Sequence, residues 1–379
     1  MEELELKILF VLSSLAMGGI ERAQVDLANA LYEKGYDITI MIYEPIYDLV
    51  DELNPNIRLI YKYNPHRIMK KIPYIRHKFY DDGMWERRAS AKRLYKYFIG
   101  KEKFDVEIAF RQGLATKIIS GSTNKKSTKL AWVHCDFKFV KEIYDKFKDP
   151  ARARKAYASF DNIICVSKQA KDSFIEVFGY KDKAKTIYNL LPIEKILKKS
   201  EEITLLKKRK TTICSVGRLM GEKGHARLLN VIERLNADGL DIDCWLIGEG
   251  AGRANLENII EEKKLTNVTL LGKQNNPYKY MKQADLYICS SYHEGYNLTV
   301  AEALILGVPV LSTKCTGPCE ILEGGEYGML VENSEDGLYA GIKELLQDEN
   351  KLITYKNKAK KRIVFFETEK IIKEITSLF

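Results

Sequence analysis

The sequence has no run of about 18 apolar residues, although 45% of its 379 residues are hydrophobic. A membrane-spanning helix is therefore not expected. The apolar stretch ILFVLSSLAM resembles the core of a secretory signal, but its leader MEELELK is acidic where such a leader is basic. We therefore interpret this stretch as a buried strand.

Cysteine is sparse, with seven residues in the chain. The odd number argues against a disulfide framework and favours a reducing compartment. Most of the cysteines lie in apolar runs such as IICVS and CWLIG, as small buried side chains do. Cys315 and Cys319 are close in sequence, but no second Cys or His pair completes a zinc site, so we expect no metal ion.

Positive charge is concentrated in the first half of the chain. The 61 Lys and Arg and 52 Asp and Glu give a net charge of 61 − 52 = +9. Residues 1–190 hold 34 basic and 25 acidic residues, whereas residues 191–379 hold 27 of each. Residues 62–103 alone hold 13 basic and 4 acidic residues, interleaved with apolar and aromatic side chains.

That pattern in residues 62–103 suits an anionic membrane surface or another polyanionic partner. The alternative is a solvated helix face whose other side packs in the core. We favour contact with a membrane or an anionic acceptor. Nucleic acid is not expected as a partner, because no recognition motif accompanies the charge.

Two passages of alternating strands and helices follow one another. The first opens with KILFVLS, a continuous apolar run typical of a strand buried on both faces. The loop SLAMGG, a helix ending at Gly35 and the strand DITIMIY come next, and this β-α-β succession predicts a parallel sheet. Later strands are expected at VEIAF, KLAWVH, NIICVS and KTIYN.

The second passage begins near residue 211, after a Lys-rich linker or peripheral helix. Its strands are expected at TTICSVG, DCWLIG, NVTLLG, DLYICSS, VPVLST and GMLVE. We predict an α/β protein with two doubly wound parallel sheets, whose ligand crevices lie at the carboxyl ends of the strands and so in a cleft between domains. The predicted domains are residues 1–190 and 191–364, with residues 365–379 as a helix that packs back on the first.

Two glycine-containing loops follow predicted strands. Gly18 and Gly19 precede the first helix, where backbone amides and the helix dipole would receive a phosphate. A packing role is the alternative. Arg218 and Lys223 lie in VGRLMGEKGH directly after a buried strand, where two cations can bind a diphosphate. The alternative there is a surface loop with ordinary charges.

The stretch SSYHEGYNLTVAEALILGVPVLST predicts a strand end, a loop and a helix. Glu294 lies in the loop and Glu302 about one turn into the helix. Two ionised carboxylates could hold vicinal sugar hydroxyls, or they could be a cap and a salt bridge. The amides of Asn297, Leu298 and Thr299 are first-turn donors suited to phosphate.

Taken together, these segments resemble the family-four retaining glycosyltransferases of the GT-B fold, in which two Rossmann-like domains face each other across a cleft. The resemblance covers almost the whole chain. It rests on MGGIERAQVDLANAL, WVH, SVGRLMGEKGH, LIGEG, LLGKQNN, the E-x7-E pattern from Glu294, GVPVLSTKCTGPCEIL, GMLV and FFETEKI, in this order. Tyr296-Asn297 replaces the more usual Phe-Gly, which leaves the identity of the sugar open.

The resemblance implies that the first domain binds the acceptor and the second binds the donor. The amides of Gly18 and Gly19 would approach the donor, and His134, at the end of the strand in LAWVHCD, would contact the sugar near the reacting centre. From the residues alone, His134 could equally be a buried histidine with a satisfied ring. Arg218 and Lys223 would bind the diphosphate and neutralise its charge as it departs.

The remaining implied roles fall on the E-x7-E stretch. Glu294 would accept hydrogen bonds from the transferred sugar, helped by the amides of Asn297, Leu298 and Thr299. Glu302 would hold the ribose. The catalytic set implied in this way is His134, Arg218, Lys223 and Glu294.

The resemblance implies a metal-independent transferase without a cofactor, whose donor is a nucleotide-diphosphate sugar and most readily a UDP-sugar. The basic segment 62–103 adds the expectation of a lipid-linked or surface-polysaccharide acceptor. Such an enzyme would be cytoplasmic and peripheral at the inner face of the cell membrane. A GT-B sugar-nucleotide epimerase and a non-catalytic nucleotide-sugar-binding subunit are the alternatives.

Overall fold

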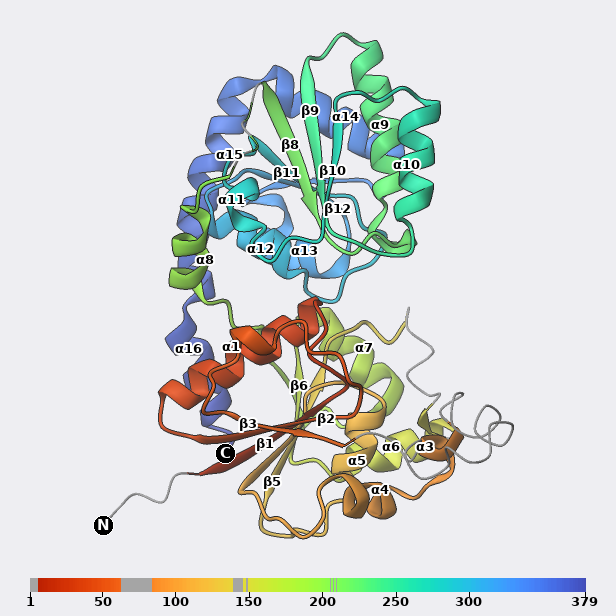
Figure 1. Cartoon of the computed structure of the whole chain (residues 1–379), viewed down its shortest axis with the longest axis vertical. Coiled ribbons are helices and arrows are strands. Elements are labelled where there is room, and N and C mark those ends of the chain that lie inside the picture. Colours follow the sequence, from red (N-terminus) through yellow and green to blue (C-terminus); the bar gives the residue numbers. More distant parts are fainter. Residues whose placement is uncertain are drawn as a thin grey trace. The chain divides into compact units, whose positions relative to one another are not determined.

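The computed structural model describes residues 6–62, 84–138, 146–147, 149–204, 206, 208 and 210–379. The chain divides into two compact units: residues 1–190 with 369–379, called here the N-terminal unit, and residues 191–368, the C-terminal unit. Each unit contains one parallel sheet with helices on both faces (Figure 1). The predicted class, two Rossmann-like α/β domains, is confirmed.

In the described residues the N-terminal sheet has seven strands in the order β3-β2-β1-β4-β5-β6-β7. They are β1 (Lys7–Leu12), β2 (Asp37–Ile42), β3 (Arg58–Tyr61), β4 (Val106–Ala109), β5 (Thr128–Val133), β6 (Asn162–Cys165) and β7 (Ala184–Thr186). The apolar runs predicted every strand except β3. That edge strand, RLIY, is only partly buried, so it lacks the continuous apolar run of the central strands.

Helices connect these strands. They are α1 (Gly19–Glu33), the 3-10 turn η1 (Val50–Glu52), α3 (Met84–Arg88), α4 (Ala91–Phe98), α5 (Leu114–Ile119), α6 (Pro150–Ala158), α7 (Lys168–Phe178) and the terminal α16 (Thr368–Thr376). Serine side chains cap two of them, because Ser90 accepts from the amide of Arg93 and Ser167 from that of Ala170.

The terminal helix α16 packs against the end of α1. Lys34 forms an ion pair of 2.8 Å with Glu369, and the rings of Tyr36 and Phe379 meet edge to face at 5.6 Å. Residues 369–379 therefore belong to the N-terminal unit although they follow the whole C-terminal unit in sequence.

In the described residues the C-terminal sheet has six strands in the order β10-β9-β8-β11-β12-β13. They are β8 (Thr211–Val216), β9 (Ile242–Ile247), β10 (Val268–Gly272), β11 (Leu286–Cys289), β12 (Val310–Thr313) and β13 (Met329–Val331). The helical elements are α8 (Ile193–Ser200), η4 (Gly221–Lys223), α9 (His225–Ala237), α10 (Arg253–Glu262), α11 (Tyr278–Met281), α12 (Leu298–Ile305), α13 (Thr316–Ile321), η5 (Glu323–Gly325), α14 (Glu335–Gln347), α15 (Glu349–Arg362) and η6 (Ile363–Phe366).

Each strand order reverses direction at one place, between β1 and β4 in the N-terminal sheet and between β8 and β11 in the C-terminal sheet. The loops that follow the two strands on either side of such a point diverge and leave a crevice, where open α/β sheets bind ligands. The residues that follow β1, β4, β8 and β11 are therefore the first places to look for function.

Candidate functional site

A partly buried ion pair joins the two loops at the reversal point of the C-terminal sheet. Lys223, after β8, donates from Nζ to Oε1 of Glu294, after β11, at 2.7 Å, and the two side chains are 21% and 9% exposed. The Ser291 hydroxyl donates to the same Oε1 at 2.5 Å. Two of the residues predicted separately from sequence are thus in direct contact.

Arg227, a buried residue of α9, holds these two loops together. Its Nε donates to the carbonyl oxygen of Ser290 at 2.9 Å and its Nη2 to that of Ser291 at 2.9 Å. Its guanidinium also lies 3.8 Å from the ring centre of Tyr292. Since Ser291 in turn binds Glu294, Arg227 fixes the backbone that presents this carboxylate. Arg227 was not predicted from the sequence, because its partners are backbone carbonyl groups, which leave no pattern in a sequence.

Backbone contacts explain two glycines of this region. Gly224 has φ +67° and lies so close to Ser290 that a Cβ would stand 2.1 Å from its carbonyl oxygen. At Gly248, with φ +145°, a Cβ would stand 1.9 Å from the carbonyl oxygen of Gly217. Only glycine permits both the backbone conformation and the close approach of these loops.

Arg218 differs from Lys223, its partner in the predicted diphosphate site. Its side chain is 60% exposed, and in the described residues it forms an ion pair with Glu222 at 3.4 Å. A surface pair of this kind contributes little to stability. Arg218 is therefore accessible to an anion, while the ammonium group of Lys223 is engaged by Glu294.

Asn297 caps α12 from a left-handed backbone conformation, with φ 77°. Its Oδ1 accepts from the amide of Val300 at 3.1 Å and from the hydroxyl of Thr299 at 2.8 Å. The Tyr287 hydroxyl donates to the Thr299 hydroxyl at 2.5 Å. The cap satisfies the Val300 amide and orients the first turn, whose earlier amides, including that of Leu298, are the predicted anion donors.

Glu302 lies deeper in α12 and is 4% exposed. Its Oε1 accepts from the Tyr278 hydroxyl of α11 at 2.9 Å. Glu294 and Glu302 are therefore both anchored by hydroxyl donors, one in the loop and the other inside the helix, as the E-x7-E spacing predicts.

Two thiols lie beside this loop. The Asn297 amide donates to Sγ of Cys289 at 3.2 Å. A hydrogen bond from Cys315 lowers the pKa of the Cys289 thiol to about 7, although burial opposes this shift, and the same bond raises the pKa of Cys315. From the sequence, Cys289 was expected to be a small buried side chain, and Cys315 was considered only with Cys319 as half of a zinc site. All seven cysteines are free thiols.

In the N-terminal unit, His134 follows β5 and is 9% exposed. Its Nε2 lies 2.8 Å from the Phe110 carbonyl oxygen, which can only accept, so Nε2 carries the proton. Burial, together with the nearby positive charge of Arg111, lowers the pKa of His134 to about 3. His134 is therefore a neutral imidazole whose Nδ1 can accept a hydrogen bond.

Gly18 and Gly19 form the start of α1, as predicted. Gly18 is the N-cap residue with extended backbone (φ −153°), and Glu21 of the first turn is 7% exposed. A Cβ on Gly18 would stand 2.4 Å from Oε2 of Glu21. The Glu21 carboxylate thus lies beside the backbone at the start of the helix.

Glu21 has a partner that the sequence analysis missed. Arg111, which follows β4, donates from Nη1 to Oε1 of Glu21 at 2.8 Å and to the Ser13 hydroxyl at 2.7 Å. Its place directly after the apolar run VEIAF is the signal that could have identified it, because predicted strand ends are where ligands bind.

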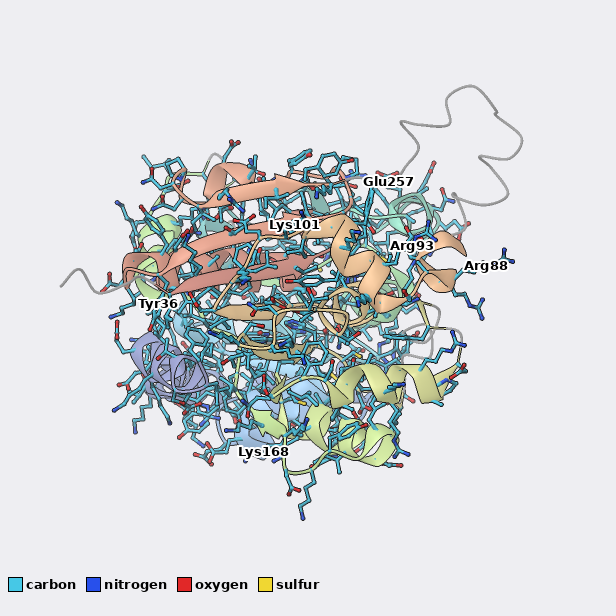
Figure 2. All side chains as sticks on the ribbon, turned by 90° about the horizontal axis from the view of Figure 1, so that it is seen from below. Tyr36, Arg88, Arg93, Lys101, Lys168 and Glu257 are labelled. Carbon is cyan, nitrogen blue, oxygen red and sulfur yellow. The ribbon has the colours of Figure 1, made fainter. Side chains whose placement is uncertain are left out.

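The basic segment 62–103 lies partly outside the described residues, which omit 63–83. In the part described, Tyr95 and Phe98 of α4 are buried in the core. The exposed residues of this part include Arg88 and Arg93, which Figure 2 shows on α3 and α4. Helix α4 thus has one apolar side in the core and one basic side toward solvent.

In the part of the chain that the structure describes, no group of three or more His, Cys, Asp or Glu side chains is arranged to hold a metal ion. No described helix is long and apolar enough to cross a membrane.

Comparison with known proteins identifies two family matches. A sequence profile described as "Glycosyltransferase Family 4" matches residues 17–195, and one described as "Glycosyl transferases group 1" matches residues 198–362. The two matches adjoin near the boundary between the two units.

Two curated relatives are similar to the chain. One, from Campylobacter jejuni, is N-acetylgalactosamine-N,N'-diacetylbacillosaminyl-diphospho-undecaprenol 4-alpha-N-acetylgalactosaminyltransferase. It is 34% identical over 222 residues, and the alignment spans 58% of this chain and 60% of that protein. The other, an uncharacterized glycosyltransferase of Haemophilus influenzae, is 24% identical over 96% of this chain and 97% of that protein.

Among solved structures, Anabaena HepE in complex with UDP and glucose is similar in fold. The TM-score is 0.76 at 18% sequence identity, and the match covers 98% of this chain and 99% of HepE. At this identity the likeness concerns the fold.

Proposed function

The chain belongs to the family 4 glycosyltransferases of GT-B fold, and from this premise we propose that it is a retaining glycosyltransferase. It transfers a sugar from a nucleotide-diphosphate sugar, of the UDP class, to a lipid-linked or cell-surface polysaccharide intermediate. The observation that carries the proposal is the Lys223–Glu294 ion pair at the reversal point of the C-terminal sheet, with exposed Arg218 in the same loop.

The donor diphosphate is assigned to Arg218 and Lys223. In the proposed reaction the bond between the anomeric carbon and the leaving phosphate oxygen breaks, and negative charge develops on the nucleotide diphosphate. Preorganised cations stabilise that charge without reorganisation, which lowers the barrier. The acceptor hydroxyl attacks from the same face, and its proton passes to the leaving phosphate. The charge is thus neutralised by side chains rather than by a metal ion.

Glu294 is assigned to the hydroxyls of the transferred sugar. The carboxylate has a second oxygen besides the Oε1 that receives Lys223 and Ser291, and an ionised carboxylate can accept several hydrogen bonds. The first-turn amides of α12 are assigned to sugar and phosphate, and Glu302 to the ribose. These assignments follow the resemblance to the family, and Glu294 and the first turn of α12 lie after β11, at the carboxyl ends of the strands.

His134 and the Gly18–Gly19 turn are the contribution of the N-terminal unit. His134 is neutral and presents Nδ1 as an acceptor, which suits a sugar hydroxyl better than a phosphate. We assign His134 to the transferred sugar, and the amides of Gly18 and Gly19 to the donor.

Two observations support the proposed acceptor: the name of one relative and the basic segment 62–103 of this chain. The name of the Campylobacter relative describes a sugar acceptor linked through a diphosphate to undecaprenol. An acceptor of that kind lies in a membrane, and the basic segment 62–103 would attract an anionic surface. We therefore place the enzyme at the inner face of the cell membrane.

The donor is tested with the whole protein and UDP-, GDP- and ADP-sugars, without added metal. We expect one nucleotide to raise the melting temperature and one conjugate to be hydrolysed slowly or transferred. Proton NMR of the product should show the anomeric configuration of the donor. Binding without any turnover would favour the non-catalytic subunit, and interconversion of donor sugars without an acceptor would favour the epimerase.

Membrane binding is tested by co-sedimentation of the protein with vesicles of phosphatidylglycerol and of phosphatidylcholine. We expect binding to the anionic vesicles that weakens as salt is raised. Glycosylation of a soluble acceptor, with neither vesicle binding nor use of a lipid diphosphate, would contradict the proposed acceptor and location.

A further inference from the structure

The N-terminal sheet carries a polar cluster at its reversal point. Ser13 follows β1, Arg111 follows β4 and His134 follows β5, and these three strands are neighbours in the sheet. Their carboxyl ends meet at one edge, where open α/β sheets bind ligands. The cluster thus has in its own unit the position that the Lys223–Glu294 pair has in the other.

Two groups hold the Arg111 guanidinium in place. Nη1 donates to the Ser13 hydroxyl at 2.7 Å and to Oε1 of Glu21 at 2.8 Å. The Glu21 side chain is 9% exposed, so this carboxylate is a largely buried partner from the first turn of α1. An arginine held by one nitrogen keeps its planar fork in a fixed direction and loses less freedom when it binds a second group.

The rest of the guanidinium is accessible. The Arg111 side chain is 42% exposed, and within the described residues its side-chain hydrogen bonds are made by Nη1. An arginine has five N–H donors, so those of Nη2 and Nε remain. Two parallel N–H groups match two oxygens of a phosphate. Neutral His134, beside it, neither repels nor competes for such an anion.

We propose that Arg111 is a substrate-binding residue whose guanidinium takes a phosphate oxyanion, and that Ser13 and Glu21 position it. This inference rests on the proposed function, since both substrates of such an enzyme carry a diphosphate. The phosphate belongs either to the acceptor or to the donor. The guanidinium would bind either phosphate through the same hydrogen bonds, and the kinetic test below separates the two sources.

The first measurement does not depend on turnover. Inorganic pyrophosphate is titrated by calorimetry into the full chain carrying Arg218→Ala and Lys223→Ala, which remove the cations of the other unit. Adding Arg111→Gln should weaken the remaining pyrophosphate affinity about 10-fold, the usual loss for charge-assisted hydrogen bonds. Arg111→Lys, which keeps the charge without the fork, should lose less.

The matched control is Arg58→Gln. Arg58 is also half-exposed (50%) and paired with a carboxylate, Glu102, at 2.6 Å, but it begins β3 and so lies at the amino end of its strand. Equal pyrophosphate affinity in the Arg111→Gln and Arg58→Gln proteins, with both folded by circular dichroism, would overturn the proposal.

The second measurement identifies the source of the phosphate in the otherwise wild-type protein. Arg111→Gln should raise the KM for a diphosphate-linked acceptor about 10-fold with little change in kcat, and leave the KM for its alkyl glycoside, which lacks phosphate, unchanged. A raised donor KM in acceptor-free hydrolysis would assign the phosphate to the donor instead. Unchanged KM for both substrates would refute the role of Arg111. If the wild-type protein turns over no nucleotide sugar while pyrophosphate binding still depends on Arg111, the proposed function fails and the anion site remains.

Discussion

Each unit has an ion pair at the reversal point of its sheet, but the cation and the carboxylate exchange places between the two units. In the C-terminal unit the cation, Lys223, follows the first strand of the unit, and the carboxylate, Glu294, follows the strand across the reversal point. In the N-terminal unit the carboxylate, Glu21, comes after the first strand and the cation, Arg111, after the strand across the reversal point. Both carboxylates are 9% exposed.

The two cations differ in exposure, and this difference indicates their use. Lys223 is 21% exposed, whereas Arg111 is 42% exposed. Charges in a partly buried pair are screened less by water and act more strongly, whereas a half-exposed arginine is open to a ligand that arrives from solvent. In the proposed function, Lys223 and Glu294 would therefore hold the donor, and Arg111 would bind a phosphate that arrives from solvent.

The largest effect is expected from Glu294→Gln. This change keeps the shape of the side chain but removes the negative charge that pairs with Lys223 and that, in the proposed function, binds the sugar hydroxyls. We expect turnover to fall about 100- to 1000-fold, as when a preorganised transition-state contact is lost. The measurement is kcat for release of the nucleotide diphosphate.

Glu332→Gln is the control for that change. Glu332 is an exposed carboxylate of the same unit, paired with Lys314 on the surface. Its replacement should leave turnover unchanged. Similar turnover in the Glu294→Gln and Glu332→Gln proteins would contradict a role for the Lys223–Glu294 pair in the reaction.

The next largest effect is expected at Arg227, which binds the backbone beside the Lys223–Glu294 ion pair. Arg227→Met leaves the Ser290 carbonyl without its buried guanidinium donor and leaves that of Ser291 with only the Thr313 hydroxyl among its buried side-chain donors, so we expect the free energy of unfolding to fall by about 3 kcal/mol. Arg234→Met, on the same helix and also stacked on a tyrosine ring, changes an exposed pair and should cost less than about 1 kcal/mol. Urea unfolding of both variants checks this, and equal losses would contradict the role given to Arg227.

A smaller effect depends on pH. Burial lowers the pKa of His225 from 6.5 to about 4. Between these values the unfolded chain binds a proton that the folded chain does not, so stability falls as the pH falls. From about pH 7.5 to about pH 5 the loss from this group is about 2 kcal/mol.

The His225→Gln protein should therefore lose about 2 kcal/mol less than the wild type over that pH range, by urea unfolding at both ends. His134, the buried histidine of the N-terminal unit, should contribute in the same direction. An unchanged pH dependence in His225→Gln would show that its ring is protonated in the folded state.

The smallest effect is expected at Gly18. Its backbone is extended, and an added Cβ would meet only the movable end of the Glu21 side chain. Gly18→Ala should lower the free energy of unfolding by less than about 1 kcal/mol, measured by urea unfolding. A larger loss would mean that the Glu21 carboxylate cannot move, and that the N-terminal pair is as rigid as the C-terminal one.

The sequence predicted the elements of both units better than their contacts. Continuous apolar runs identified the central strands, because strands of parallel sheets are buried on both faces. They also placed Lys223 and Glu294 after strands. The ion pair between these two residues, which are 71 positions apart in sequence, depends on the strand order that makes β8 and β11 neighbours. Arg111 and Glu21 were missed for the same reason, since 90 residues separate them.

The return of α16 to the N-terminal unit also bears on how the chain is made. Because the N-terminal unit includes residues 369–379, it lacks α16 until the whole C-terminal unit has been synthesised. The C-terminal unit is one unbroken segment, residues 191–368, and has all its residues earlier. During synthesis, the first unit to start is therefore the last that can be completed.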